Sequence, residues 1–236
     1  MRLFPALAAA MLSIALPGAA HATSVYLTGN AVGPYPIGNF ERDGVLWTSA
    51  GITQYRYVGN YVPGGVPVEF LGYCVDFLQP EITGLFELAP LSARFSAERA
   101  TLLNTLLGNA AALEAVASDD NAKLLIRTAT QLAIWELSEE SSSTLAITGD
   151  GFKAFDADDS ASYAAARILA DDYLLKAASV WTPVAGKQAR LLYNPELQSA
   201  VYLAAVPEPA TWATMIGGMG LAGGALRRRQ QVRAAA

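Results

Sequence analysis

A change in composition near residue 90 constrains the fold more than any other feature of this sequence. The stretch from Ser24 to about Leu88 is rich in Val, Ile, Tyr, Gly and Pro, which is typical of short strands separated by turns. From Ser96 to Leu137 the chain is instead rich in Ala, Leu, Glu and Arg at helical spacing, which is typical of amphipathic helices. The sequence therefore predicts a mostly β first half followed by a mostly α segment.

Strand patterns return near the end of the chain, where two segments are predicted to pair around a turn at residues 194–196. We expect these closing strands to join the early sheet, so that the helices form an insertion. The predicted fold class is α+β, a β-rich sandwich or barrel-like domain with an inserted helical subdomain. The candidate strands are Ser24–Leu27, Ile52–Val58, Val68–Phe77, Lys187–Tyr193 and Gln198–Ala204.

Two helices can be placed more closely within this insertion. Residues 118–120, Ser-Asp-Asp, form an N-cap cluster for a helix that contains Lys123–Leu137, because such side chains bind free backbone N–H groups at a helix start. A further helix is predicted over Ser160–Ala178. Its expected apolar side comprises Tyr163, Ile168, Leu169 and Leu175.

Residues 1–22 have the order of a secretory signal. Arg2 gives a positive start, Leu3–Leu16 is almost wholly apolar, and Ala20-His21-Ala22 is a small-x-small cleavage pattern. We expect the mature chain to begin near Thr23, so the only histidine is removed with the signal. Hydrolases that use a histidine base are then excluded, and one cysteine without histidine disfavours a zinc site. We predict no metal and no cofactor.

The C-terminal segment, residues 206–236, has three parts in order: Val206-Pro207-Glu208-Pro209, an apolar run over Ala210–Leu226, and Arg227-Arg228-Arg229. An uncharged run followed by arginines is typical of a helix that enters a membrane with its end in the cytoplasm. The whole order resembles the PEP-CTERM sorting signal of Gram-negative bacteria. That resemblance implies processing by an exosortase-type membrane enzyme and release to the cell surface or an extracellular exopolysaccharide matrix.

The segment between the two ends, residues 23–205, is long enough for one domain with a sizeable core. It holds 11 basic and 20 acidic residues, a balance that suits an exported, soluble domain. Nucleic acid is not an expected partner, because phosphate binding needs clustered positive charge.

The only cysteine, Cys74, lies in the sequence Gly-Tyr-Cys-Val-Asp within a predicted strand. A disulfide inside the chain is impossible with one cysteine. An intermolecular disulfide, a buried inert thiol and a reactive thiol all remain open, since free cysteine is often buried as a small apolar residue.

A second unusual residue is Gln131, in Thr130-Gln131-Leu132-Ala133-Ile134-Trp135 of the predicted helix. Gln131 shares a helix face with Leu124, Thr128 and Trp135, so its amide is predicted to point inward. One interpretation is a simple hydrogen bond to neighbouring backbone. The other is that Cys74 faces Gln131, attacks its amide carbon and expels ammonia to leave an internal thioester, since enforced proximity favours such a reaction.

The pair Tyr-Cys-Val-Asp and Thr-Gln-Leu-Ala-Ile-Trp resembles the paired signature of the thioester domains of bacterial surface adhesins. The resemblance implies a cross-link between Cys74 and Gln131 that a target nucleophile opens. It also makes Tyr73, Asp76, Thr130 and Trp135 candidates for the thioester environment, although ordinary packing explains the aromatic residues equally well. Such adhesins are mostly attached to Gram-positive walls, whereas this tail resembles a Gram-negative signal.

The leading hypothesis is an exported, adhesin-like protein that captures an amine on an unidentified surface or matrix target. It is not an enzyme, since the reaction consumes the bond, and no catalytic residue is assigned. The alternative is a noncovalent structural or carbohydrate-binding protein of the exopolysaccharide matrix. Its candidate sugar-stacking aromatics are Trp47, Tyr55, Tyr57 and Tyr61, which are equally typical of strand pairs.

Overall fold

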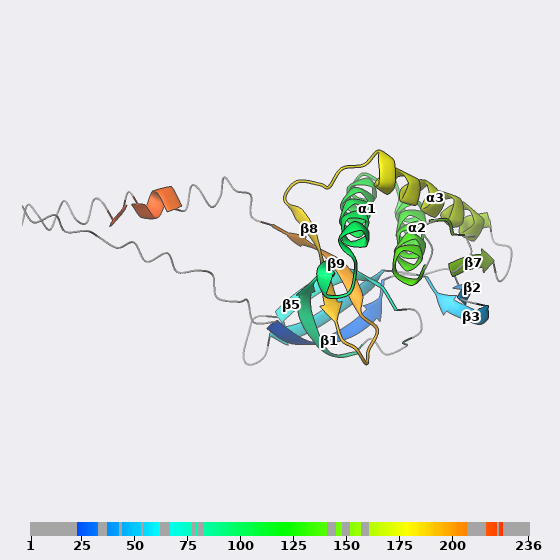
Figure 1. Cartoon of the computed structure of the whole chain (residues 1–236), viewed down its shortest axis with the longest axis horizontal. Coiled ribbons are helices and arrows are strands. Elements are labelled where there is room, and N and C mark those ends of the chain that lie inside the picture. Colours follow the sequence, from blue (N-terminus) through cyan, green and yellow to red (C-terminus); the bar gives the residue numbers. More distant parts are fainter. Residues whose placement is uncertain are drawn as a thin grey trace, which may run out of the picture.

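The computed structural model places a barrel of strands against a layer of helices, with a small second sheet beside α2 and α3 (Figure 1). The predicted signal segment, residues 1–22, and Pro207, Glu208 and Pro209 lie outside the described residues. The structure describes residues 23–32, 37–42, 44–52, 54–61, 67–76, 79, 83–140, 145–147, 152–156, 161–206, 216–220, 222 and 223.

Six strands form a closed barrel in the order β1-β4-β5-β9-β8-β6. All neighbouring pairs are antiparallel. The closing strands β8 and β9 lie between β5 and β6, which confirms that they return to the early sheet and that the helices are inserted between β6 and β8. The barrel strands are β1 (Thr23–Ala31), β4 (Tyr55–Tyr61), β5 (Pro67–Cys74), β6 (Thr83–Pro90), β8 (Lys187–Tyr193) and β9 (Ala200–Ala205).

Alternation along the strands explains the barrel interior. In β1, Val25 and Leu27 are fully buried, whereas Tyr26 between them is exposed, as expected when successive side chains point to opposite faces. Their buried partners inside the barrel come from four other strands, so the interior is a packed core. These partners are Tyr57, Phe86, Leu192, Ala200 and Tyr202.

Three helices form a layer on one side of the barrel: α1 (Ala97–Ala115), α2 (Asp120–Glu139) and α3 (Ala161–Ser179). α1 and α2 contact barrel strands, whereas α3 packs against α1, α2 and β7 (Phe152–Asp156). A short 3-10 helix, η1 (Leu91–Ala93), leads from β6 toward α1. The predicted cap cluster is confirmed, because the Asp119 carboxylate accepts a hydrogen bond from the Ala122 N–H. Residues 128–137 in the second half of α2 are buried without interruption. This half of α2 therefore lies inside the molecule, between the barrel and the other helices.

The predicted apolar side of α3 is wrong at two positions. Ile168 is 73% exposed and Leu175 is 65% exposed. The face that packs inward uses small and aromatic residues instead, because alanines allow α3 to approach α2 closely. Its buried members are Tyr163, Ala166, Ala170, Tyr173, Leu174 and Ala177.

A second, three-stranded sheet has no counterpart in the sequence prediction. It has the order β3-β2-β7 and is formed by β2 (Ile37–Arg42), β3 (Val45–Gly51) and β7 (Phe152–Asp156). The pairing of β2 with β7 joins segments more than a hundred residues apart, and local pattern does not reveal such pairings. Phe40 of β2 packs edge-on against Trp135 of α2, which attaches this sheet to the helical layer.

The C-terminal tail was predicted to contain a membrane-spanning helix. Only residues 216–220, 222 and 223 of the apolar run are described, and they are helical. Among the described residues, no helix combines the length and apolar character needed to cross a membrane.

Candidate functional site

Cys74 lies at the last position of β5, and its side chain is completely buried. Burial raises the pKa of the Cys74 thiol well above its ordinary value, while a hydrogen bond with Tyr57 partly opposes this shift. The Tyr57 hydroxyl lies 3.7 Å from Cys74 Sγ. The thiol is therefore neutral at physiological pH and sheltered from solvent.

Gln131 meets Cys74 from the buried half of α2. The Cys74 N–H donates to Gln131 Oε1 over 3.0 Å, and Gln131 Nε2 donates to the Cys74 carbonyl oxygen over 2.8 Å. The Gln131 side chain has no exposed surface. Its amide is thus held at both ends by the main chain of the residue with which a thioester is predicted.

The strand pairing explains why these backbone groups are available. β4 pairs with β5 only as far as Gly72, and on the other side the Val75 N–H donates to the Ser199 carbonyl. Because alternate residues of a strand point their N–H and C=O groups to opposite sides, the Cys74 groups face the side that β4 has left. The Gln131 amide takes the place of a strand partner there.

A second glutamine, Gln198, contacts the sulfur itself. The Cys74 thiol donates to Gln198 Oε1 over 2.9 Å, and Gln198 Nε2 donates to the Asp76 carbonyl oxygen over 2.7 Å. Gln198 is 7% exposed and lies in the turn between β8 and β9. Sequence reasoning placed this residue in a closing strand and gave it no role, because only barrel closure brings it to Cys74.

The other predicted environment residues lie around this centre at different positions. Tyr73, the residue before Cys74, points to the opposite face of β5 and hydrogen-bonds with Thr130. Burial raises the pKa of the Tyr73 hydroxyl well above its ordinary value. Thr130 also donates to the Ile126 carbonyl. Trp135 packs against Phe40, with ring centroids 4.9 Å apart. None of these contacts is with the sulfur, so they are packing contacts around the site.

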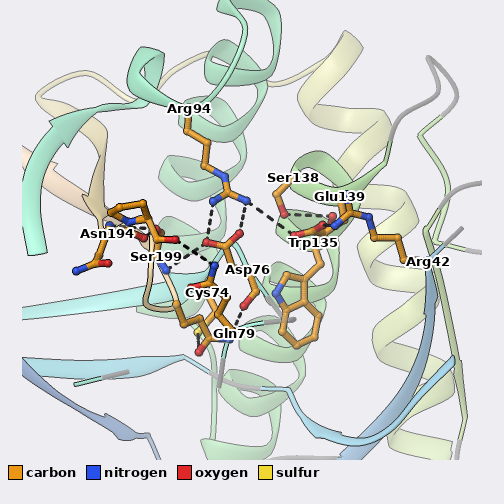
Figure 2. Close-up of polar contacts among 12 residues, drawn as sticks. Arg42, Cys74, Asp76, Gln79, Arg94, Trp135, Ser138, Glu139, Asn194 and Ser199 are labelled. Carbon is orange, nitrogen blue, oxygen red and sulfur yellow. Dashed lines mark hydrogen bonds and ion pairs between the residues drawn. The ribbon is translucent and has the colours of Figure 1, made fainter. Parts of the chain in front are cut away.

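Asp76 belongs to a network of charged side chains that also contains Arg94, Glu139 and Arg42 (Figure 2). Arg94 binds both oxygens of the Asp76 carboxylate and lies 4.0 Å from Glu139, which also pairs with Arg42 of the small sheet. The Asp76 carboxylate accepts a further hydrogen bond from the Ser199 N–H. Burial raises the pKa of Glu139 to about 7, although Arg42 and Arg94 oppose the shift. This network fixes the position of Asp76, whose main-chain carbonyl oxygen accepts the hydrogen bond from Gln198 Nε2.

Glu136 is a buried carboxyl on α2 whose Oε1 accepts a hydrogen bond from the Ala146 N–H over 2.9 Å. Burial raises its pKa to about 8, and the nearby Glu140 adds to the shift. Across the described ranges, no three His, Cys, Asp or Glu side chains are grouped as a bound metal ion would require.

Among solved structures, the chain is similar to the N-terminal domain of the Streptococcus pyogenes pilus tip adhesin Cpa. The two are 15% identical, the match covers 76% of this chain and 98% of that chain, and the TM-score is 0.40. No curated protein matches the sequence.

One family model matches the end of the chain. It describes the PEP-CTERM protein-sorting motif and covers residues 205–229, which include Val206, Pro207, Glu208 and Pro209. This motif marks exported proteins that are processed at a membrane, and it implies exosortase as the processing enzyme. The chain therefore carries a PEP-CTERM sorting motif.

Proposed function

We propose that this chain is an exported binding protein in which Cys74 and Gln131 form an internal thioester that captures a target amine. The observation that carries the proposal is the reciprocal pair of hydrogen bonds between the Gln131 amide and the Cys74 main chain. These hydrogen bonds hold both ends of the buried Gln131 amide against the main chain of Cys74. Holding two reacting groups close together raises their effective concentration and so favours the reaction.

The same geometry supports the chemistry of bond formation. As Cys74 Sγ attacks the Gln131 carbonyl carbon, negative charge develops on Oε1, which accepts from the Cys74 N–H. A preorganised donor at a developing oxyanion lowers the barrier. The C–S bond forms, the C–N bond breaks, and the thiol proton leaves with the nitrogen as ammonia. No external oxidant or cofactor is required.

When a target is captured, the sulfur is the leaving group, whereas it was the nucleophile in bond formation. A target amine attacks the Gln131 carbonyl carbon, the C–S bond breaks, and a proton from the amine returns to Cys74 as the thiol. The product is an amide bond between Gln131 and the target. Amines are the expected class because they are strong nucleophiles without a histidine base, and the mature chain is expected to have none.

Burial of the site suits a bond that must survive until it meets its target. Cys74 and Gln131 are both fully buried, so bulk water is excluded from the thioester. The PEP-CTERM motif supports the proposal that capture occurs outside the cell, at the cell surface or in the extracellular matrix. One bond serves one target molecule, so the protein is not an enzyme. The noncovalent sugar-binding alternative is not favoured at Tyr57, since that side chain is fully buried.

An intact mass of the purified full chain tests the proposal. We expect the chain to be lighter by one ammonia than its sequence requires and to gain one methylamine on incubation, with release of one titratable thiol. The Cys74→Ser and Gln131→Glu variants keep the size of each side chain and serve as controls that show neither change. A wild-type chain of full mass with no methylamine uptake would rule out the thioester.

A further inference from the structure

The sorting motif begins inside the folded barrel. Its family model starts at residue 205, and Ala205 is the last residue of β9. Val206 is also held by the barrel, because its N–H donates to the Gly186 carbonyl oxygen over 2.9 Å. Pro207 has no N–H and cannot donate a further bond of this kind. The motif that is processed at a membrane is therefore joined to the barrel without a linker.

This direct connection limits the distance between the barrel and that membrane. The apolar run of the motif begins at Ala210, four residues after Val206. An extended chain covers about 3.5 Å per residue, so these two residues are at most about 14 Å apart. When the apolar run enters the lipid, Val206 and its partner Gly186 lie within that distance of the bilayer.

The turn over residues 184–187, which meets the end of β9, is fixed by its own contacts. The Lys187 N–H donates to the Val184 carbonyl oxygen over 3.2 Å. Gly186 has a φ of 71°, in the left-handed region that favours glycine. Val184 packs so closely on α1 that a Cβ at Gly108 would lie 3.0 Å from Val184 Cγ2. The turn is therefore a rigid part of the domain.

The surface around this turn lacks the acidic character of the rest of the domain. Residues 177–186 and 197–206 contain no Asp, Glu, Lys or Arg, whereas residues 23–205 hold 11 basic and 20 acidic residues. Anionic lipid headgroups attract lysine, and a surface without carboxylates does not repel them. The exposed residues beside the Val206–Gly186 contact form what we call the exit surface: Pro183, Ala185, Lys187, Ala205 and Val206.

We propose that the exit surface is a membrane-docking site, which rests on the lipid headgroups while the sorting motif is processed, with Lys187 against headgroup phosphates. This inference rests on the sorting motif and is independent of the proposed thioester. Small and apolar side chains approach the bilayer without burying a charge, and an ammonium forms a charge-assisted hydrogen bond with phosphate. The small sheet of β2, β3 and β7 lies on the side of the domain away from the end of β9 (Figure 1), so it faces away from the docked surface.

Fluorescence quenching of the full chain in lipid nanodiscs tests the site. The nanodiscs contain phosphatidylcholine and phosphatidylglycerol, and part of the lipid carries a quencher on its headgroup. Ala185→Cys gives a label site on the exit surface, and Val45→Cys gives a control site on β3, where Val45 is 55% exposed. Cys74 is fully buried and so does not take the label. We expect quenching at residue 185 and none at residue 45, with Ala205→Cys as a second label site on the exit surface.

Lys187→Gln tests the contact with anionic headgroups. A lysine near an anionic surface contributes about 1 kcal/mol, so the ratio of docked to undocked molecules should fall about fivefold. Nanodiscs of phosphatidylcholine alone should produce a similar loss in the wild-type chain. Lys153→Gln is the matched control, since Lys153 lies on β7 with its side chain 37% exposed. We expect this variant to be quenched as strongly as wild type.

A flexible Gly-Ser spacer inserted between Val206 and Pro207 separates docking from tethering. The spacer lowers the effective concentration of the exit surface at the bilayer. A surface with its own affinity for lipid should then be quenched less at residue 185 than without the spacer, but still more than at residue 45.

Four results would overturn the inference. Equal quenching at residues 185 and 45 would remove the docking site, as would loss of their difference when the spacer is present. Lys187→Gln that is quenched like wild type would contradict the headgroup contact. Quenching that appears only after the processing enzyme is added would show that the partner of this surface is a protein and not lipid.

Discussion

Glu136 is a single residue whose ionisation is linked to folding. Its Oε1 accepts from the Ala146 N–H, and its Oε2 is buried without a hydrogen-bond partner among the described residues. Burial raises the pKa of this carboxyl from 4.5 to about 8, so the folded chain keeps a proton that the unfolded chain releases. The free energy of unfolding should therefore fall as pH rises between these values, by at most about 1.4 kcal/mol per pH unit for one proton.

The substitution Glu136→Gln removes the titrating proton and keeps a carbonyl oxygen that can accept from the Ala146 N–H. We expect Glu136→Gln to be more stable than wild type at pH 8 and to show a flatter dependence of stability on pH, measured by urea unfolding from pH 5 to 8. Some slope remains from Glu139, whose pKa is raised to about 7. Glu87→Gln, at an exposed position of β6, is the control, and an equal flattening there would contradict the assignment.

At the scale of an element, the start of α1 depends on its cap. The Ser96 hydroxyl accepts a hydrogen bond from the Arg99 N–H over 3.2 Å. Loss of such a cap costs about 1 kcal/mol, so Ser96→Ala should lower the free energy of unfolding by that amount. Ser96→Asp keeps an acceptor at the cap and should retain most of the stability. Denaturant unfolding of both variants distinguishes loss of the cap from any effect of substitution at this position.

At the scale of the whole molecule, the helices and the barrel share one core. The same buried cluster contains Leu132 of α2, Val75 beside β5, Leu191 of β8 and Val201 of β9. Such a shared core should unfold as one cooperative unit. Leu132→Ala leaves a cavity that costs about 2–5 kcal/mol, and we expect circular dichroism and tryptophan fluorescence to report the same lowered midpoint. Two separate transitions would show that the barrel and the helices unfold independently.

Local patterns were sufficient for much of the fold. The structure has the predicted change from strands to helices after residue 90, the cap at Asp119 and the two closing strands. The outward face of α3 was missed at Ile168 and Leu175, because periodicity alone does not reveal which apolar side chains find a partner. The sheet formed by β2, β3 and β7 was also missed; β2 and β3 form a local hairpin, whereas the pairing of β2 with β7 joins distant segments.

The sequence by itself determined the terminal sorting motif, the presence of one thiol, and the choice of Cys74 and Gln131 as candidate partners. These depend on residue identity and local order. The tertiary structure alone decided which atoms meet: Gln131 binds the Cys74 main chain where β4 ends, and Gln198 reaches the sulfur from the opposite end of the domain sequence. The reason is physical. Gln131 is 57 positions from Cys74 in the sequence and Gln198 is 124 positions from it, so these hydrogen bonds exist only after the barrel has closed and α2 has packed against it.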